Sequence, residues 1–270
     1  MPLKLQDRMA PTYTMECRIL QNRPLAKNQW LISVKSEAKK FPSFHLGNFC
    51  MLSIPSMIDP LLPRPYAIAE EKEGAWTFIY RVTGKQTRFL AALQAGARVD
   101  LLGPFGKGIS REVFHSGRHI FIAGGVGYAS LLPMIEEIGG TARAEVYYGV
   151  REDLEVIRKG KLPIEFASDD GSIGYKGRLP DLLKKKDFSN AQVYVCGPSG
   201  MMKGLYSILP ADQTLYFLEE AMGCGFGICV GCVVHVDLPD GQSSPVKSCL
   251  EGPMFSGSRL KTWSSQTGGH

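Results

Sequence analysis

The spacing of four cysteines in the last quarter of the chain constrains its fold more than any other feature. Cys224, Cys229 and Cys232 form a C-x4-C-x2-C pattern, and Cys249 follows in a later segment. Three thiolates from one tight loop and a fourth from a segment that folds back are the ligand pattern of a plant-type [2Fe–2S] cluster. The spacing therefore predicts a metal-binding, electron-carrying module at this end of the chain.

Glycines interrupt the cysteine loop at Gly225, Gly227 and Gly231. Without a Cβ they can turn the backbone sharply and aim N–H groups at the sulfides. Two alternatives remain open. Four cysteines also hold structural zinc, usually as two paired knuckles, and they can form two disulfides. Disulfide frameworks are typical of much smaller secreted chains, and residues 1–10 lack the layout of a secretion signal. The bunched spacing favours the cluster.

Length and charge exclude several classes of protein. The chain has 270 residues, 44% of them hydrophobic, which is enough for two or three compact cores. No apolar run approaches the roughly 20 residues that a membrane-spanning helix needs, so we expect no membrane partner and a cytoplasmic location. The formal net charge of +5 comes from scattered basic residues, apart from three consecutive lysines at 184–186. This distribution does not support nucleic-acid binding.

The first part of the chain has a β-type pattern. Residues 13–110 consist of short alternating or apolar runs, such as 30–34, 76–82 and 98–102, separated by Pro, Gly and Asn. They predict an antiparallel β-barrel. One helix is expected within it at residues 87–93, where Phe89, Leu90 and Leu93 have helical spacing. We assign residues 1–110 to this first domain.

The pattern then changes to strands that alternate with helices, over a second domain at residues 111–215. Strands are predicted at 119–123, 144–149, 164–167, 192–195 and 215–218, and helices at 130–138, 151–158 and 180–186. This order is typical of a parallel α/β sheet with helices on both faces. Residues 216–270 form the third, small cluster-bearing domain, whose tail after Gly257 is expected to be disordered or a small contact arm.

Two motifs of the α/β domain fall at the carboxyl ends of its predicted strands. Gly124, Gly125 and Gly127 follow the first strand, where missing side chains let a dinucleotide's diphosphate approach the amides of a helix N-terminus. A glycine-rich turn without a ligand is as common an outcome of this pattern. Cys196 and Gly197 end the fourth strand at the same sheet edge, where open α/β folds bind ligands. The two signals together predict one dinucleotide crevice.

Three motifs of the barrel carry groups that an anionic flavin dinucleotide needs. Their members are Arg64, Pro65, Tyr66, Ala67, Ile79, Tyr80, Arg81, Gln86 and Thr87. Arginines and a helix N-terminus bind phosphates, and tyrosine rings stack on planar groups. An ordinary strand entry and a half-exposed sheet pair remain the alternative interpretation of these residues.

Taken in order along the chain, these motifs resemble a known family. They run RPY-A, IYR-V, GK-T, GGVG, CGPSGM, the cysteine loop and a final C-x-E-G-P-x-F that begins at Cys249. Over residues 13–257 this order is similar to the electron-transfer subunit of the heteromeric, NAD-linked dihydroorotate dehydrogenase, in the ferredoxin reductase superfamily. The ending from Cys249 to Phe255 is its most family-specific part.

The resemblance implies three cofactors. FAD would lie in the barrel. Residues 64–67 would contact the flavin and its phosphates, residues 79–81 its ring and ribityl region, and Gln86 and Thr87 its diphosphate. A nicotinamide dinucleotide would lie in the α/β domain, with the three glycines at its diphosphate and Cys196 and Gly197 at the nicotinamide. The absence of a clear Ser/Arg pair near Asp169 and Asp170 favours NAD over NADP. The four cysteines would hold the [2Fe–2S] cluster.

The implied function is an electron relay in pyrimidine biosynthesis. The partner, an FMN-containing dihydroorotate dehydrogenase catalytic subunit, would oxidise dihydroorotate, and electrons would pass through the cluster and FAD to NAD. Alone, the chain would act as an NADH diaphorase. No residue of it receives a catalytic role, because C–H abstraction would occur on the partner. The alternatives are a small diaphorase subunit of a transhydrogenase or hydrogenase complex and, from another class, a zinc-bearing nucleotide-sensing module.

Some positions depart from the family or stay open. Ala67 stands where a Ser or Thr hydroxyl often bonds the flavin ring, and Gln86 stands where Gly is frequent. The flavin is therefore expected to bind through backbone N–H groups with altered redox tuning. Glu219 or Glu220 would contact the nicotinamide amide. An acid at 169 or 170 would contact ribose hydroxyls. For each of these acids, a solvated side chain is the alternative.

Overall fold

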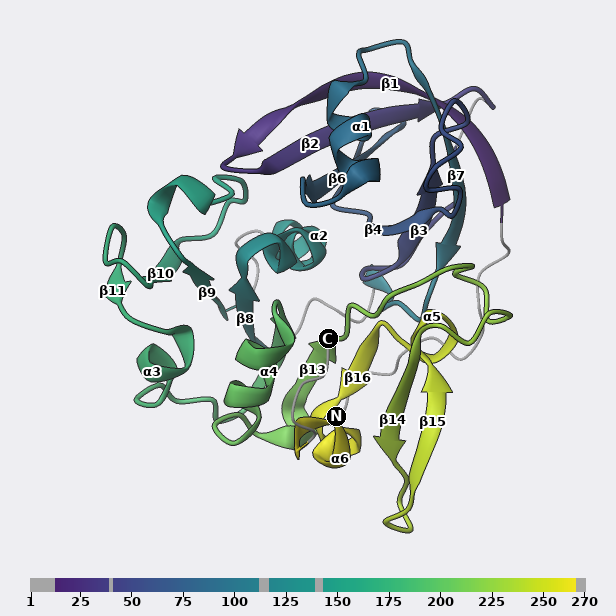
Figure 1. Ribbon diagram of the computed structural model, residues 1–270. Helices are drawn as coiled ribbons and strands as arrows, with labels where there is room; N and C mark the ends of the chain where they lie inside the picture. Colours follow the sequence, from purple (N-terminus) through teal and green to yellow (C-terminus); the bar gives the residue numbers. More distant parts are fainter. Residues whose placement is uncertain (1–12, 39–40, 112–116, 139–142, 266–270) are drawn as a thin grey trace.

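The described part of the chain forms two seven-stranded sheets and a two-stranded hairpin (Figure 1). The computed structural model describes residues 13–38, 41–111, 117–138 and 143–265. The prediction that residues 1–10 carry no secretion signal concerns residues outside these ranges. Among the described residues, none of the helices has the length and apolar character that crossing a membrane requires.

The first sheet is the predicted antiparallel barrel, with strand order β4-β3-β7-β1-β2-β6-β5. The strands are β1 (Tyr13–Ala26), β2 (Gln29–Ser36), β3 (Phe49–Ser53), β4 (Arg64–Ala67), β5 (Glu70–Lys72), β6 (Ala75–Arg81) and β7 (Arg98–Phe105). The sheet curls until β4 approaches β6, so the barrel is half closed. Its interior is filled by alternating side chains such as Ile32, Trp76 and Phe78, and by Leu90 of helix α1 (Lys85–Ala92). The predicted helix is thus confirmed, with its start two residues earlier.

The second sheet confirms the predicted α/β pattern, with strand order β11-β10-β9-β8-β12-β13-β16. Its strands are β8 (Arg118–Gly124), β9 (Arg143–Val150), β10 (Ile164–Ser168), β11 (Tyr175–Lys176), β12 (Ala191–Cys196), β13 (Thr214–Phe217) and β16 (Met254–Ser256). All neighbours are parallel except β16, which is antiparallel to β13.

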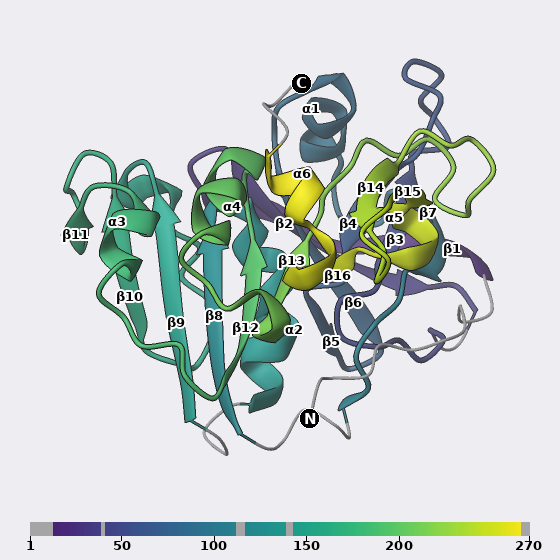
Figure 2. The same cartoon turned by 90° about the horizontal axis from the view of Figure 1, so that it is seen from below.

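Helices cover both faces of this sheet (Figure 2). Helix α2 (Tyr128–Ile138) packs with Phe121 and Tyr148 on the face that meets Ile79 of the barrel. Helices α3 (Leu179–Leu183) and α4 (Ser199–Tyr206) bury apolar side chains on the other face. The predicted helices at 130–138 and 180–186 are therefore confirmed with shifted ends, whereas α4 was not predicted.

The predicted helix at residues 151–158 is wrong. Only a single 3-10 turn, η3 (Asp153–Glu155), forms there. This turn lies against the barrel, where the N–H of Lys27 donates to the carbonyl of Leu154 at 2.7 Å. Lys159, just after the segment, pairs with Glu70 of the barrel at 2.9 Å. Contacts between the two sheets thus replace the hydrogen bonds of the expected helix.

The C-terminal segment leaves the second sheet and returns to it. After β13 a loop carries three cysteines towards β3 and β7, and the hairpin β14 (Val233–Asp237) with β15 (Ser243–Lys247) and the short helix α5 (Ser248–Glu251) follow. Strand β16 then pairs with β13, and the turn η5 (Gly257–Arg259) and helix α6 (Lys261–Ser265) bring Trp263 into the core beside α4. Up to Ser265 the tail is a packed contact arm, so the expectation of disorder is wrong there.

Candidate functional site

A cavity of about 580 Å³ lies between the barrel, α2 and the segment that follows β13. All nine residues of the three barrel motifs line it, from Arg64 at the start of β4 to Thr87 in α1. The strand β4 and the end of β6 are brought together because the sheet curls, which places residues far apart in sequence on one wall. Its size is in the range of known cofactor sites.

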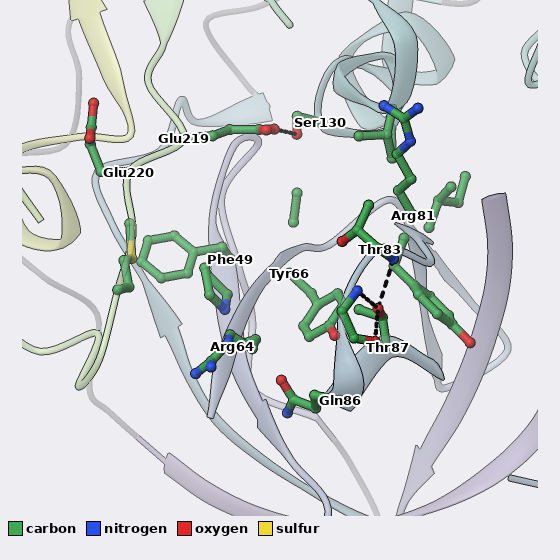
Figure 3. Close-up of a pocket in the computed structure, with 18 of the residues that line it drawn as sticks. Phe49, Arg64, Tyr66, Arg81, Thr83, Gln86, Thr87, Ser130, Glu219 and Glu220 are labelled. Atoms are coloured by element: carbon green, nitrogen blue, oxygen red, sulfur yellow. Dashed lines mark hydrogen bonds between the residues drawn. The ribbon is translucent and has the colours of Figure 1, made fainter. Parts of the chain in front are cut away.

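Two buried polar atoms on this wall have no hydrogen-bond partner among the described residues. They are the hydroxyl of Tyr66 and Oε1 of Gln86 (Figure 3). The Nε2 of Gln86 donates to the carbonyl of Leu52 at 3.2 Å, so only the oxygen is left unpaired. Burying an unpaired polar group costs about 1–3 kcal/mol. Both atoms therefore favour a ligand with hydrogen-bonding groups in this cavity.

The N-terminus of α1 faces the same cavity. The Oγ1 of Thr87 accepts hydrogen bonds from the N–H groups of Thr83 and Gly84, both at 3.0 Å (Figure 3). Because this hydroxyl already closes the first turn, Thr87 acts as a helix cap. The free backbone N–H groups of the turn and its positive dipole end are the groups that would face an anion.

A second cavity, of about 220 Å³, adjoins the first. The two share five lining residues, Arg81, Val126, Leu218, Glu219 and Glu220. The predicted dinucleotide residues Gly124, Gly125, Gly127 and Gly197 all line the second cavity. Cys196 lies behind this wall and is fully buried. Residues Gly125–Gly127 form a 3-10 turn that runs directly into α2, so the cavity lies at a helix N-terminus.

The two glycine turns approach each other more closely than side chains would allow. A Cβ on Gly197 would stand 2.9 Å from the backbone of Gly124, and one on Gly124 would stand 2.6 Å from the sulfur of Met201. Gly125 instead has a φ of +52° and open space where a Cβ would be. Glycine is therefore required for packing at Gly124 and Gly197 and for backbone geometry at Gly125.

A carboxylate joins the two cavities. The hydroxyl of Ser130 donates to Oε1 of Glu219 at 3.3 Å, and the thiol of Cys196 lies 3.5 Å from the same oxygen. Glu219 projects into the open cavity, but protein surrounds it on several sides, and this burial raises its pKa. Burial and the neighbouring Glu219 also raise the pKa of Cys196, which keeps it a thiol. Sequence reasoning missed Ser130, since a serine within a helix carries no motif.

The acids that follow β10 lie apart from this arrangement. Asp170 accepts hydrogen bonds from the N–H and hydroxyl of Ser172, at 2.9 and 2.7 Å, and these bonds lower its pKa. It therefore closes its own turn. Neither Asp169 nor Asp170 lines either cavity.

The four motif cysteines meet as two pairs beside the barrel. Cys224 and Cys229 are hydrogen-bond neighbours, and so are Cys232 and Cys249. All seven cysteines of the chain are free thiols, so the disulfide alternative is wrong. Within the described ranges, no three His, Cys, Asp or Glu side chains are spaced to hold a single metal ion. Two thiolates for each of two irons is the donor set that a [2Fe–2S] cluster uses.

Backbone amides converge on the first pair. Although burial opposes it, the N–H groups of Cys229, Phe226 and Ile228 lower the pKa of Cys224 to about 6, and the Cys229 N–H lies 3.4 Å from the sulfur. Burial and the thiol of Cys232 raise the pKa of Cys249 to about 12. Ionising Cys249 beside Cys232 would place two negative charges together inside the protein, which is unfavourable without a cation. The site therefore suits a cationic metal centre.

The loop turns at two of its three glycines. Gly225 and Gly227 have φ values of +81° and +90° and pack against Met51 and Leu250. The third left-handed position belongs to Val230, at +50°, and not to Gly231 as the glycine pattern predicted.

Comparisons with known proteins agree with this geometry. Residues 219–261, which contain all four cysteines, match the model of the iron-sulfur cluster binding domain of dihydroorotate dehydrogenase B. The dihydroorotate dehydrogenase B (NAD(+)) electron transfer subunit of Desulforamulus reducens is 35% identical over 225 residues, which cover 77% of this chain and 84% of that protein. The subunit of the same name from Enterococcus faecalis is 32% identical, with 90% and 96% covered.

Solved structures share the fold at lower identity. An NADH-dependent reduced ferredoxin-NADP oxidoreductase superposes with a TM-score of 0.75 at 22% identity, over 90% of this chain and 88% of that one. Phthalate dioxygenase reductase gives 0.61 at 14% identity, over 87% and 77%. The structural likeness establishes the fold, and the sequence likeness over most of both chains establishes the relationship. The chain belongs to the family of electron transfer subunits of dihydroorotate dehydrogenase B.

Proposed function

We propose that this chain carries electrons between a dihydroorotate dehydrogenase catalytic subunit and NAD, in pyrimidine biosynthesis. Its relatives are named electron transfer subunits of the NAD(+)-linked enzyme. The observation that carries the proposal is the contiguity of three candidate sites. The two cavities share a wall, and Phe49 and Met222 of the first cavity pack in one apolar cluster with Cys232 and Cys249.

The first cavity is proposed to hold FAD. The unpaired polar atoms of Tyr66 and Gln86 would receive hydrogen bonds from it, and the N-terminus of α1 with Arg64 would bind its diphosphate. Ala67 offers no hydroxyl to the ring, so backbone groups are left to bond there. When bound, the flavin supplies the exchange of electron pairs with nicotinamide and of single electrons with an iron–sulfur cluster.

The second cavity is proposed to hold the diphosphate and nicotinamide of NAD. The turn at Gly125 offers backbone N–H groups at a helix N-terminus, and Gly197 lines the same cavity, where the planar nicotinamide ring would lie. Glu219 is placed to accept a hydrogen bond from the nicotinamide amide, because it lies at the junction of the cavities. Cys196 has a positioning role through its contact with Glu219.

Cys224, Cys229, Cys232 and Cys249 are proposed to hold the [2Fe–2S] cluster, and the loop that carries the first three is proposed to meet the partner. Large apolar side chains stand exposed around them, with Ile228 at 75%, Val230 at 58% and Leu62 at 55%. Such exposure beside a redox centre favours a protein partner. We propose an FMN-containing catalytic subunit as that partner and the cytoplasm as the location.

The test is an absorption spectrum of the anaerobically purified protein, with iron, sulfide and flavin assays, before and after NADH is added. Bleaching of both flavin and cluster bands is expected. The catalytic subunit and dihydroorotate are then added with NAD, and NADH should form. A colourless protein with one zinc per chain would contradict the proposal. Bleaching without any transfer from the catalytic subunit would favour a diaphorase subunit of another complex.

A further inference from the structure

One carboxylate, that of Glu155, links the segment after β9 to the barrel. Its side chain is only 7% exposed. Oε1 accepts a hydrogen bond from Nε of Arg151 at 2.9 Å and another from its Nη2, and Oε2 accepts from the Arg151 N–H at 3.3 Å. This side chain is therefore fixed firmly within its own domain.

The same carboxylate faces an arginine of the other domain. Nη2 of Arg81, the last residue of β6, lies 3.7 Å from Oε1 of Glu155. The backbone is held as well, because Nε2 of Gln29 donates to the Glu155 carbonyl at 2.6 Å and Gln29 pairs with Arg81 in the β2–β6 register. Burial alone would raise the pKa of Glu155, but the hydrogen bonds from Arg151 and the charge of Arg81 lower it, so the carboxylate stays ionised.

Arg81 is one of the residues that line both cavities. Its side chain is 39% exposed, and 3.7 Å is too long for a hydrogen bond, so its donors are available to a ligand. In Figure 3 its guanidinium lies on the side of the cavity where Ser130 lies, away from Gln86. Without a nearby carboxylate, an exposed arginine at this junction would sample many positions, and the binding of a ligand would carry the entropic cost of ordering it.

We propose that Glu155 is a positioning residue for the nicotinamide dinucleotide: it holds the Arg81 guanidinium where the cavities meet, ready for the dinucleotide's diphosphate. The inference rests on the proposed function of the second cavity. Electrostatic attraction orients Arg81 while its donors remain unpaired.

The test uses the full chain loaded with flavin and cluster. Glu155→Gln keeps the size of the side chain and removes its charge. We expect the dissociation constant of NAD+, measured by calorimetry, and the KM for NADH in dye reduction to rise about tenfold, the equivalent of about 1.4 kcal/mol. The kcat and flavin content should stay unchanged, because a loss of uniform binding raises KM alone.

Arg81→Gln should give a loss of similar size, and the double variant should be no worse than either single one, because the two side chains act as a unit. Glu155→Asp, which retains the charge, should recover part of the affinity. The matched control is Glu152→Gln. Glu152 pairs with Lys27 between the same two domains but lines neither cavity, so NAD+ affinity should not change.

Several results would overturn the inference. They are an unchanged or increased NAD+ affinity in Glu155→Gln, an equal loss in Glu152→Gln, or additive losses in the double variant. If Glu155→Gln fails to retain flavin, the same comparison is made with Glu155→Asp alone, because Arg81 also lines the proposed flavin cavity. A parent protein that binds flavin but no NAD+ would instead contradict the proposed function of the second cavity.

Discussion

Gly127 lies so close to Cys196 that no side chain fits between them: a Cβ on Gly127 would stand 2.8 Å from the carbonyl carbon and oxygen of Cys196. This contact joins the turn after β8 to the turn after β12. Both turns line the second cavity, so the shape of that cavity depends on their close approach.

The first prediction follows from this contact. Gly127→Ala should lower the free energy of unfolding by about 1–3 kcal/mol, because the clash is with backbone, and it should raise the KM for NADH. Denaturant unfolding and dye reduction measure the two effects. Gly200→Ala is the control. It lies exposed in α4 with nothing within 4 Å of an added Cβ, so it should be neutral or stabilising by up to about 1 kcal/mol. Equal effects of the two substitutions would contradict the argument.

Local patterns were sufficient to predict most of the architecture. The period-2 runs of the barrel and the alternation of strand and helix are set by which faces are buried, and burial is visible in the sequence. The nine barrel residues and the four glycines also meet as expected, because strand ends at one sheet edge must converge.

The failures have a common physical cause, which is contact between distant segments. Residues 151–158 have a helical pattern, but their backbone and the carboxylates of Glu152 and Glu155 bind the barrel instead. The pairing of β16 with β13 and the burial of Trp263 depend on a return of the chain that no local signal marks. Ser130 became a site residue only because Glu219 lies opposite it.

The second prediction concerns the cysteine motif. Cys249→Ser should leave dye reduction by NADH within about twofold, and it should abolish electron flow to the catalytic subunit because one thiolate pair is lost. Iron content and coupled NADH formation are measured. Cys17→Ala, which removes a buried cysteine of the barrel core, should keep both. Loss of dye reduction in Cys249→Ser would mean that the cluster holds the whole chain together.

The third prediction tests the exposed apolar residues near the cysteines. Ile228→Glu should weaken binding to the catalytic subunit about ten- to hundredfold, because a charge would have to be desolvated in the interface. Calorimetry or co-elution measures this effect, and dye reduction should not change. Leu20→Glu places the same charge on an exposed apolar position of β1 and should leave the complex intact. A complex that tolerates Ile228→Glu would move the interface elsewhere.

The last prediction uses the carboxylate at the junction of the cavities. Although Glu219 is exposed to the open cavity, desolvation by the protein packed around it raises its pKa, so it takes up a proton at a higher pH than a glutamate in water. The ionised carboxylate is a stronger acceptor for the amide N–H than the neutral carboxyl group, whose protonated oxygen is a donor. The KM for NADH should therefore rise as the pH falls through this raised pKa.

Glu219→Gln should remove that pH dependence and have a high KM already at neutral pH. Steady-state dye reduction from about pH 5 to pH 8 gives the KM for NADH of the parent protein and of Glu219→Gln. This pH range lies above the ordinary glutamate pKa. Glu220→Gln is the matched control: Glu220 lines the same cavities, but its carboxylate points away from Ser130 in Figure 3, so the parent pH profile should persist. If Glu220→Gln abolished the dependence and Glu219→Gln retained it, the neighbouring acid would be the nicotinamide contact, and the Ser130–Glu219 hydrogen bond would serve packing alone.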